Sequence, residues 1–148
     1  MLDRQLPSHP RRVVTRHRTS RVTHARQPGV GGLVAALENS CALIDSWEAA
    51  PRPFGPAVLA DKPDQRFNDG RVDAAGRLWV GSLTSDKANP TATLYRLDPD
   101  GSLTEIFGGL TTSNGAAFSP DGRTFYHADT PTHAIRAYYF DPATGTMG

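Results

Sequence analysis

Two asparagines occupy the same place in two similar stretches of the chain. Asn68 lies in RFNDG and is followed by the glycine of DAAGR, Gly76, while Asn114 lies in TSNGA and is followed by the glycine of SPDGR, Gly122. An asparagine amide carries both a donor and an acceptor, so two of them can hold a polar ligand in one shared site. Asn-Gly and Asp-Gly pairs are equally strong turn signals that need no ligand. The spacing leaves both interpretations open.

Other side chains that could do chemistry have structural explanations. His127 and His133 flank Pro131 and could form a zinc pair, but two solvated or hydrogen-bonded histidines explain them better. Cys41 is the single cysteine and lies in the apolar run CALID, which predicts a packed and unreactive thiol. Aspartates beside glycine turns often accept backbone N–H bonds, and this role is predicted for three of them, Asp69, Asp73 and Asp129.

The asparagines belong to a longer repeat, which predicts the elements that position them. An offset of 46 places Gly76 on Gly122 and Trp79 on Phe125. A fainter third copy lies upstream, in which residues 31–35 match residues 76–80. The first full copy contains four segments with strand character, 70–73, 77–83, 93–98 and 102–107; the second contains 116–118, 123–129 and 134–141. Four strands in about 45 residues are typical of a propeller blade. A β-sandwich also has short strands, but it requires no repeat of this period.

Length and composition set further limits. The chain has 148 residues and a net charge of +1, so one domain is expected, and nothing calls for nucleic acid or a membrane surface as a partner. Seven arginines crowd the first 26 residues, where Pro7 and Pro10 argue against an amphipathic targeting helix. We expect a loosely held basic arm over residues 1–12 and one β domain over residues 13–148. The absence of signal and membrane-span patterns favours a cytoplasmic protein.

Three stretches of the sequence together resemble the SMP-30/gluconolactonase/regucalcin-like family. They are RFNDGRVDAAGRLWVGSL at 66–83, LYRLDPDGSL at 94–103 and SNGAAFSPDGRTFYHADT at 113–130. The resemblance runs from about Gly31 to Gly148 and more faintly from about Val13. It implies an all-β fold that is a partial six-bladed β-propeller, with about two and a half to three blades of four-stranded antiparallel sheet. It also implies that the chain is a piece of a protein about twice as long.

The same resemblance assigns site residues. Asn114 matches one ligand of a single divalent metal ion, which is most often calcium, with zinc, magnesium and manganese as alternatives. Arg66, Asn68 and Asp86 match positions that contact a sugar lactone. The two carboxylate ligands fall in blades outside this chain, and the general-base aspartate is expected beyond residue 148, so no catalytic residue is assigned within it.

The predicted function is metal-dependent hydrolysis of an aldonolactone by a gluconolactonase-like enzyme, of which this chain alone is expected to show little activity. The alternative is a non-catalytic calcium-binding or ligand-binding propeller module. Uncovered blade edges and faces also predict self-association.

Overall fold

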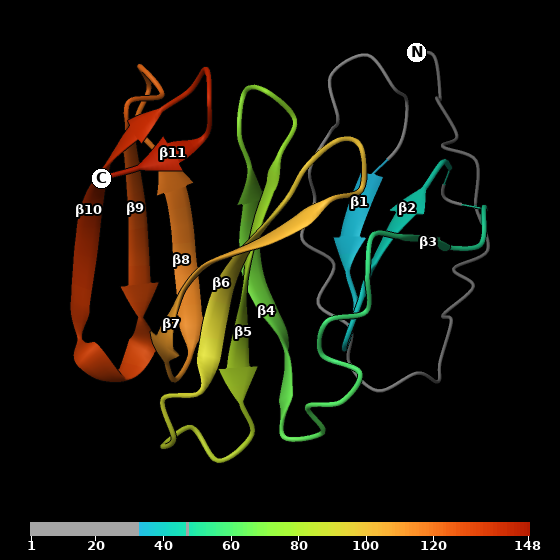
Figure 1. Ribbon diagram of the computed structural model, residues 1–148, viewed down its shortest axis with the longest axis horizontal. Coiled ribbons are helices and arrows are strands. Elements are labelled where there is room, and N and C mark those ends of the chain that lie inside the picture. The colour runs from blue at the N-terminus through green and yellow to red at the C-terminus, as the bar shows by residue number, and fades with distance from the viewer. Residues whose placement is uncertain (1–32, 47) are drawn as a thin grey trace, which may run out of the picture.

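The computed structural model describes residues 33–46 and 48–148, which form three antiparallel sheets (Figure 1). The first sheet contains β1 (Leu33–Ala36), β2 (Cys41–Ile44) and β3 (Arg52–Phe54). The second contains β4 (Gln65–Val72), β5 (Leu78–Thr84), β6 (Ala92–Leu97) and β7 (Leu103–Leu110). The third contains β8 (Ser113–Phe118), β9 (Thr124–Asp129), β10 (Ala134–Asp141) and β11 (Thr146–Met147). The basic arm predicted over residues 1–12 lies outside the described residues.

Strands that are neighbours in the chain are neighbours in each sheet, and the three sheets stand side by side as consecutive blades (Figure 1). Blade 1 is the sheet of β1–β3, blade 2 that of β4–β7 and blade 3 that of β8–β11. In the described ranges the only helix is the short 3-10 turn Thr130–Thr132. None of the described segments forms a helix long and apolar enough to cross a membrane. The predicted all-β, partial-propeller fold is confirmed.

The faint upstream copy is also confirmed by strand register. Leu33 pairs with Ile44 in blade 1, and Leu78 pairs with Leu97 in blade 2. The sequence match places these two pairs in the same positions of the repeat, so β1 and β2 correspond to β5 and β6.

The hydrophobic core lies between the blades, in two layers. Leu78 and Val80 of β5 pack toward blade 1, against residues such as Val34 and Cys41. Trp79, between them in sequence, packs toward blade 3. Successive side chains of a strand point to opposite faces, so a strand buried on both faces is apolar along its whole length. This explains why LWV lacks the alternation of a half-exposed strand.

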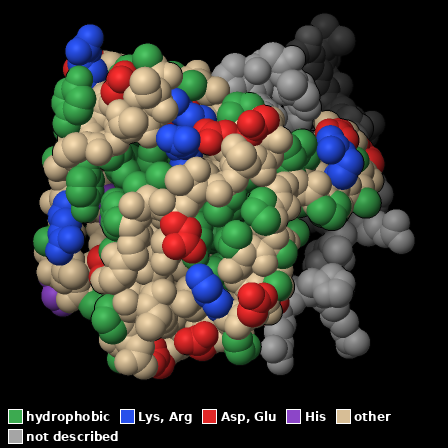
Figure 2. All heavy atoms as spheres, in the orientation of Figure 1, with side chains coloured by type: hydrophobic (Ala, Val, Ile, Leu, Met, Phe, Trp, Pro, Cys, Tyr) green, Lys and Arg blue, Asp and Glu red, His purple; other side chains and the backbone are tan. Residues whose placement is uncertain are grey.

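Burial agrees with most of the predicted core. Leu78, Trp79 and Phe125 are fully buried, while Phe118 is half-buried. Cys41 is 1% exposed, which confirms that it is packed, and burial raises the pKa of its thiol to about 12. On the face in Figure 2, acidic and basic side chains are interspersed, in keeping with the net charge of +1.

The hairpins that open blades 2 and 3 differ by one residue. In blade 2 the Asp73 N–H donates to the Arg77 carbonyl at 3.0 Å. In blade 3 the Ser119 N–H donates to the Thr124 carbonyl at 2.9 Å, one position later in the repeat. A one-residue change of register moves each side chain of a strand to the other face.

The predicted equivalence of Trp79 and Phe125 is therefore wrong. Equivalent residues of consecutive blades point the same way, but these two face each other across the interface, with ring centroids 5.5 Å apart. Tyr126 takes the place of Trp79 in blade 3. It is 38% exposed, whereas Trp79 is fully buried.

Buried polar contacts tie blade 2 to blade 3. The Asp73 carboxylate accepts hydrogen bonds from Arg77 Nε at 2.6 Å and from Trp79 Nε1 at 3.0 Å. It also accepts the backbone N–H groups of Ala75 and Arg77. The Arg77 guanidinium then donates to the Pro142 carbonyl of blade 3 at 2.7 Å. The structural role predicted for Asp73 is confirmed.

Candidate functional site

Both candidate asparagines lie on the first strands of their blades, and those strands, β4 and β8, are in contact. Each strand departs from regular pairing here, β4 between Phe67 and Gly70 and β8 between Asn114 and Ala117. Bulges bend a strand and re-aim its side chains, and they often occur beside functional sites. The structure thus brings the repeated asparagines to adjacent strands at matching irregularities.

Asn68 is held from the neighbouring blade. Its Nδ2 donates to the Ser113 carbonyl at 2.7 Å, and the residue is 3% exposed. A carbonyl can only accept, so the amide nitrogen must face Ser113 and the amide oxygen must point elsewhere. The amide oxygen of Asn68 is therefore the end of the side chain that could accept from another group.

Asn114 is half-buried beside this contact. Its Oδ1 accepts the N–H of Gly115 at 3.1 Å. The Asp69 carboxylate accepts the same N–H at 2.8 Å, and that of Ala116 at 3.4 Å, so Asp69 supports the bulge of β8. The predicted structural role of Asp69 is confirmed. An amide oxygen has two lone pairs, so Oδ1 keeps one for a further partner.

Arg66 lies two residues before Asn68 on β4, opposite Leu83 of β5. It is half-buried, and its Nη1 donates to the Phe67 carbonyl at 3.1 Å. A guanidinium has five donors, so this contact orients the group and still leaves it able to bind oxygen atoms of a ligand.

Asp86 is exposed in the loop between β5 and β6. The Ser85 N–H donates to the Asp64 carbonyl at 2.7 Å, which ties this loop to the start of β4, near Arg66. The Asp86 carboxylate accepts the backbone N–H groups of Ala88 and Asn89, at 3.0 and 3.2 Å. These bonds lower its pKa, so it is ionised at neutral pH. Its oxygens mainly stabilise its own loop.

The histidine pair does not form a metal site. His127 is 1% exposed and its Nε2 lies 2.7 Å from the Ser113 hydroxyl, while His133 is exposed after the 3-10 turn. Across the described part of the chain, no group of three or more His, Cys, Asp or Glu side chains could hold a metal ion. His127 is therefore a hydrogen-bonded histidine, which is one of the two structural explanations that the sequence offered.

The described residues do not by themselves fit a divalent cation. Asn114 and Asn68 offer neutral amide oxygens, whereas such cations are usually held by several oxygen ligands that include carboxylates. The carboxylates nearest in the fold are already occupied. Asp69 binds the bulge of β8, and Asp129 accepts the N–H groups of Thr111 and Thr112, which also confirms its predicted structural role.

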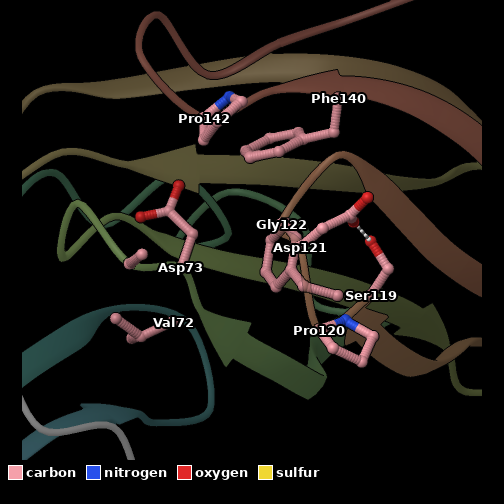
Figure 3. A pocket seen from close by; sticks show the side chains of 10 residues that line it. Val72, Asp73, Ser119, Pro120, Asp121, Gly122, Phe140 and Pro142 are labelled. Carbon is pink, nitrogen blue, oxygen red and sulfur yellow. Dashed lines mark hydrogen bonds between the residues drawn. The ribbon is translucent and has the colours of Figure 1, made fainter.

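A cavity of about 250 Å³ lies at the other end of β4 and β8 (Figure 3). Most of its wall is apolar, from side chains such as Val72, Phe118 and Phe140. Its two carboxylates are occupied, Asp73 by the contacts given above and Asp121 by the Ser119 hydroxyl. None of the four predicted site residues lines this cavity, so it is distinct from the candidate site.

Three consecutive antiparallel blades, two of them four-stranded, define a β-propeller, and polar residues where the first strands of blades 2 and 3 meet form a candidate site between blades. The family model described as SMP-30/Gluconolactonase/LRE-like region matches residues 6–148. The chain belongs to this family.

Individual proteins that are similar to this chain support the same family. A 6-deoxy-6-sulfogluconolactonase from Pseudomonas putida is 38% identical over 75% of this chain and 38% of its own length. A regucalcin from Danio rerio is 40% identical over 79% of this chain and 40% of its own length. The crystal structure of a calcium-binding regucalcin from Agrobacterium tumefaciens matches with a TM-score of 0.75 and 26% identity, over 84% of this chain and 41% of that one. The chain thus spans about 40% of the length of these relatives.

Proposed function

We propose that this chain supplies the substrate-contacting part of a sugar-lactone hydrolase. The observation that carries the proposal is the contact between the first strands of blades 2 and 3. There the Asn68 Nδ2 donates to the Ser113 carbonyl at 2.7 Å, directly beside Asn114. Arg66 precedes Asn68 on the same strand, and the loop of Asp86 is tied to the start of that strand. Relatives named as a sulfogluconolactonase and as a putative sugar lactone lactonase support the reaction class.

In this proposal each residue binds a different part of the lactone. The Arg66 guanidinium donates to ring or carbonyl oxygens, and the Asn68 amide oxygen accepts from a hydroxyl. The ionised Asp86 accepts from further hydroxyls. Holding the sugar in one orientation lowers the entropic part of the barrier to hydrolysis.

We also propose Asn114 as one ligand of a divalent cation, with calcium as the first candidate and zinc, magnesium or manganese as alternatives. A neutral amide oxygen is a hard ligand suited to calcium, but one such ligand cannot hold the ion against water. The described residues therefore do not account for the cleavage of the ester bond, and low turnover is expected from them alone.

The test combines binding and turnover with D-glucono-1,5-lactone as the probe. We expect saturable binding to the folded chain, weakened about fivefold or more in Arg66→Ala and Asn68→Ala, the factor that corresponds to losing one hydrogen bond. Thr104→Ala, an exposed change on β7, is the matched control. Absence of saturable binding, or equal affinities in all variants, would contradict the proposal.

The second candidate is a non-catalytic calcium-binding module, favoured by the similar structure described as a calcium-binding protein. Calcium titration of the chain and of Asn114→Ala separates the two. Calcium binding that depends on Asn114, with no lactone binding, would favour the module.

A further inference from the structure

A buried serine–histidine pair lies directly behind Asn68. The Ser113 hydroxyl and His127 Nε2 are 2.7 Å apart, and both residues are 1% exposed. The Ser113 carbonyl accepts the Asn68 amide, also at 2.7 Å. The three residues come from β9, β8 and β4, so the contacts run from the second strand of blade 3 to the first strand of blade 2.

The surroundings fix this pair in one place. The His127 ring lies between Phe107, edge-on at 5.6 Å, and Phe125, stacked at 6.2 Å. Gly81 makes room for the Ser113 side chain, because a Cβ at that position would lie 1.7 Å from the hydroxyl oxygen. The hydroxyl therefore packs directly against the backbone of β5 on one side and bonds His127 on the other.

The pair is not arranged as a nucleophile and its base. The Ser113 hydroxyl is enclosed between His127 Nε2 and the backbone at Gly81, so it does not face a ligand. The acidic side chain nearest in sequence to the histidine, Asp129, is used by the backbone N–H groups of Thr111 and Thr112. A triad requires that the acid orient the histidine, and no such contact is present among the described residues.

We propose that Ser113 and His127 form a positioning pair for Asn68. The hydrogen bond between them anchors the start of β8, so that the Ser113 carbonyl receives the Asn68 amide nitrogen and the amide oxygen faces the ligand. This role rests on the proposed lactone site, in which Asn68 contacts the substrate.

The need for an anchor follows from the local backbone. Ser113 and Asn114 pair with Asp129 and Ala128, but the pairing of β8 with β9 is interrupted directly after Asn114, so the ladder supports the Ser113 carbonyl from one side only. An asparagine amide is nearly symmetrical in shape, and only its partner decides which end faces a ligand. A displaced Ser113 carbonyl would leave Asn68 free to turn and to present a donor where an acceptor is needed.

The experiment follows the Asn68 side-chain amide by nuclear magnetic resonance in the full 148-residue chain. Its signals are assigned by their loss in Asn68→Asp. In the wild type we expect slow exchange of these protons with solvent. Ser113→Ala and His127→Phe each delete the anchoring bond, and each should speed this exchange about fivefold or more. The double variant should add little, because both changes break the same bond.

Ser82→Ala is the matched control, since it removes an equally buried hydroxyl that bonds Gln65 and Thr93 and not Asn68. His127→Gln retains a group that can bond Ser113 and should restore slow exchange. If Ser113→Ala does not fold, Ser113→Cys weakens the same bond at similar volume and replaces it.

Binding of D-glucono-1,5-lactone separates this inference from the proposed function. Affinity should fall about fivefold in the two deletion variants and stay unchanged in Ser82→Ala. Fast exchange in the wild type, or unchanged exchange in both deletion variants, would overturn the positioning pair. A responsive Asn68 in a chain that binds no lactone would support the anchoring and refute the lactone site.

Discussion

The Asp73 carboxylate is a buried charge whose removal tests how blades 2 and 3 are joined. Asp73→Asn leaves Arg77, whose side chain is 8% exposed, without its ionic partner. Breaking a buried pair from one side is strongly destabilising, so we expect a loss of about 3 kcal/mol in the free energy of unfolding. Urea unfolding followed by far-ultraviolet circular dichroism measures it.

Asp121→Asn is the control for this change. Asp121 occupies the corresponding turn of blade 3 but is exposed, and it accepts from Ser119 and Arg123 without a buried ionic partner. An exposed substitution of this kind should cost about 0.5 kcal/mol or less. Equal losses in the two variants would show that burial of the Asp73–Arg77 pair contributes nothing.

His127 gives a second prediction at the residue scale, in the pH dependence of stability. Burial lowers its pKa below the ordinary value of 6.5, against smaller opposing effects of the nearby Asp129 and Asp69, while Arg136 lowers it further. The unfolded chain keeps the ordinary pKa, so it takes up a proton first as the pH falls through 6.5. Stability should therefore be full above this value and decrease below it.

Unfolding free energies at about pH 7.5 and about pH 5.5 measure this effect in the wild type and in His127→Gln. The decrease on acidification should be smaller in the variant, because glutamine does not titrate. The same decrease in both proteins would mean that other groups cause it.

The role of a single residue could be predicted from the sequence where its hydrogen-bond partners are close to it in the chain. The backbone-binding roles of Asp69 and Asp73 were predicted correctly because each lies beside a glycine turn, where a carboxylate has few alternatives. Asp86 belongs to the same class, since it accepts from Ala88 and Asn89, and the Asp-x-x-Asn spacing was the available signal. The contact of Asn68 with Ser113 joins residues 45 positions apart and depends on how two blades pack, which sequence patterns do not specify.

At the scale of elements, the turn between β10 and β11 is shaped by Arg77 of blade 2. Gly145 has a φ of +70°, and a Cβ there would lie 2.6 Å from Arg77 Nη1. Arg77 cannot withdraw easily, because it is bonded to Asp73 and to the Pro142 carbonyl. Gly145→Ala should therefore suffer both backbone strain and a clash between blades.

Gly109→Ala provides the matched comparison, since Gly109 has a φ of +74° and no atom lies within 4 Å of the place that an alanine methyl group would take. Both variants carry the strain of a left-handed alanine. The difference between them isolates the clash and should be about 1–3 kcal/mol in the free energy of unfolding. Equal thermal and urea stability would show that Arg77 moves aside without cost.

Strands were predicted more accurately than their register. The segments 93–98 and 134–141 were predicted from β-branched and aromatic residues, and they agree closely with β6 (Ala92–Leu97) and β10 (Ala134–Asp141). The turns DAAGR and SPDGR look equal in length, so the sequence aligned Trp79 with Phe125. The turn of blade 3 is one residue longer than that of blade 2, and this is visible only from the hydrogen bond that closes each turn. That bond is accepted by the Arg77 carbonyl in blade 2 and by the Thr124 carbonyl in blade 3.

At the scale of the whole molecule, one face of blade 3 remains apolar and exposed. Tyr126, Ile135 and Tyr139 are 38%, 75% and 63% exposed, and they are the exposed large hydrophobic side chains within the described ranges. They share a face, because Tyr126 pairs with Ala137 in register, two residues from both Ile135 and Tyr139. The corresponding face of blade 2 is covered by blade 3, where Trp79 is fully buried.

We therefore predict that this chain self-associates through the Tyr126–Ile135–Tyr139 face. Exposed apolar patches mark association surfaces, and burying such side chains contributes about 1.5–3 kcal/mol each. Sedimentation velocity over a range of concentrations should show an average mass that rises with concentration. The double change Ile135→Lys and Tyr139→Lys should keep the chain monomeric, because two ammonium groups cannot be buried unpaired. Thr104→Lys, at an exposed position of β7, adds charge away from the face and should associate like the wild type. A wild-type chain that stays monomeric at all concentrations, or a double variant that associates equally well, would show that this face does not drive association.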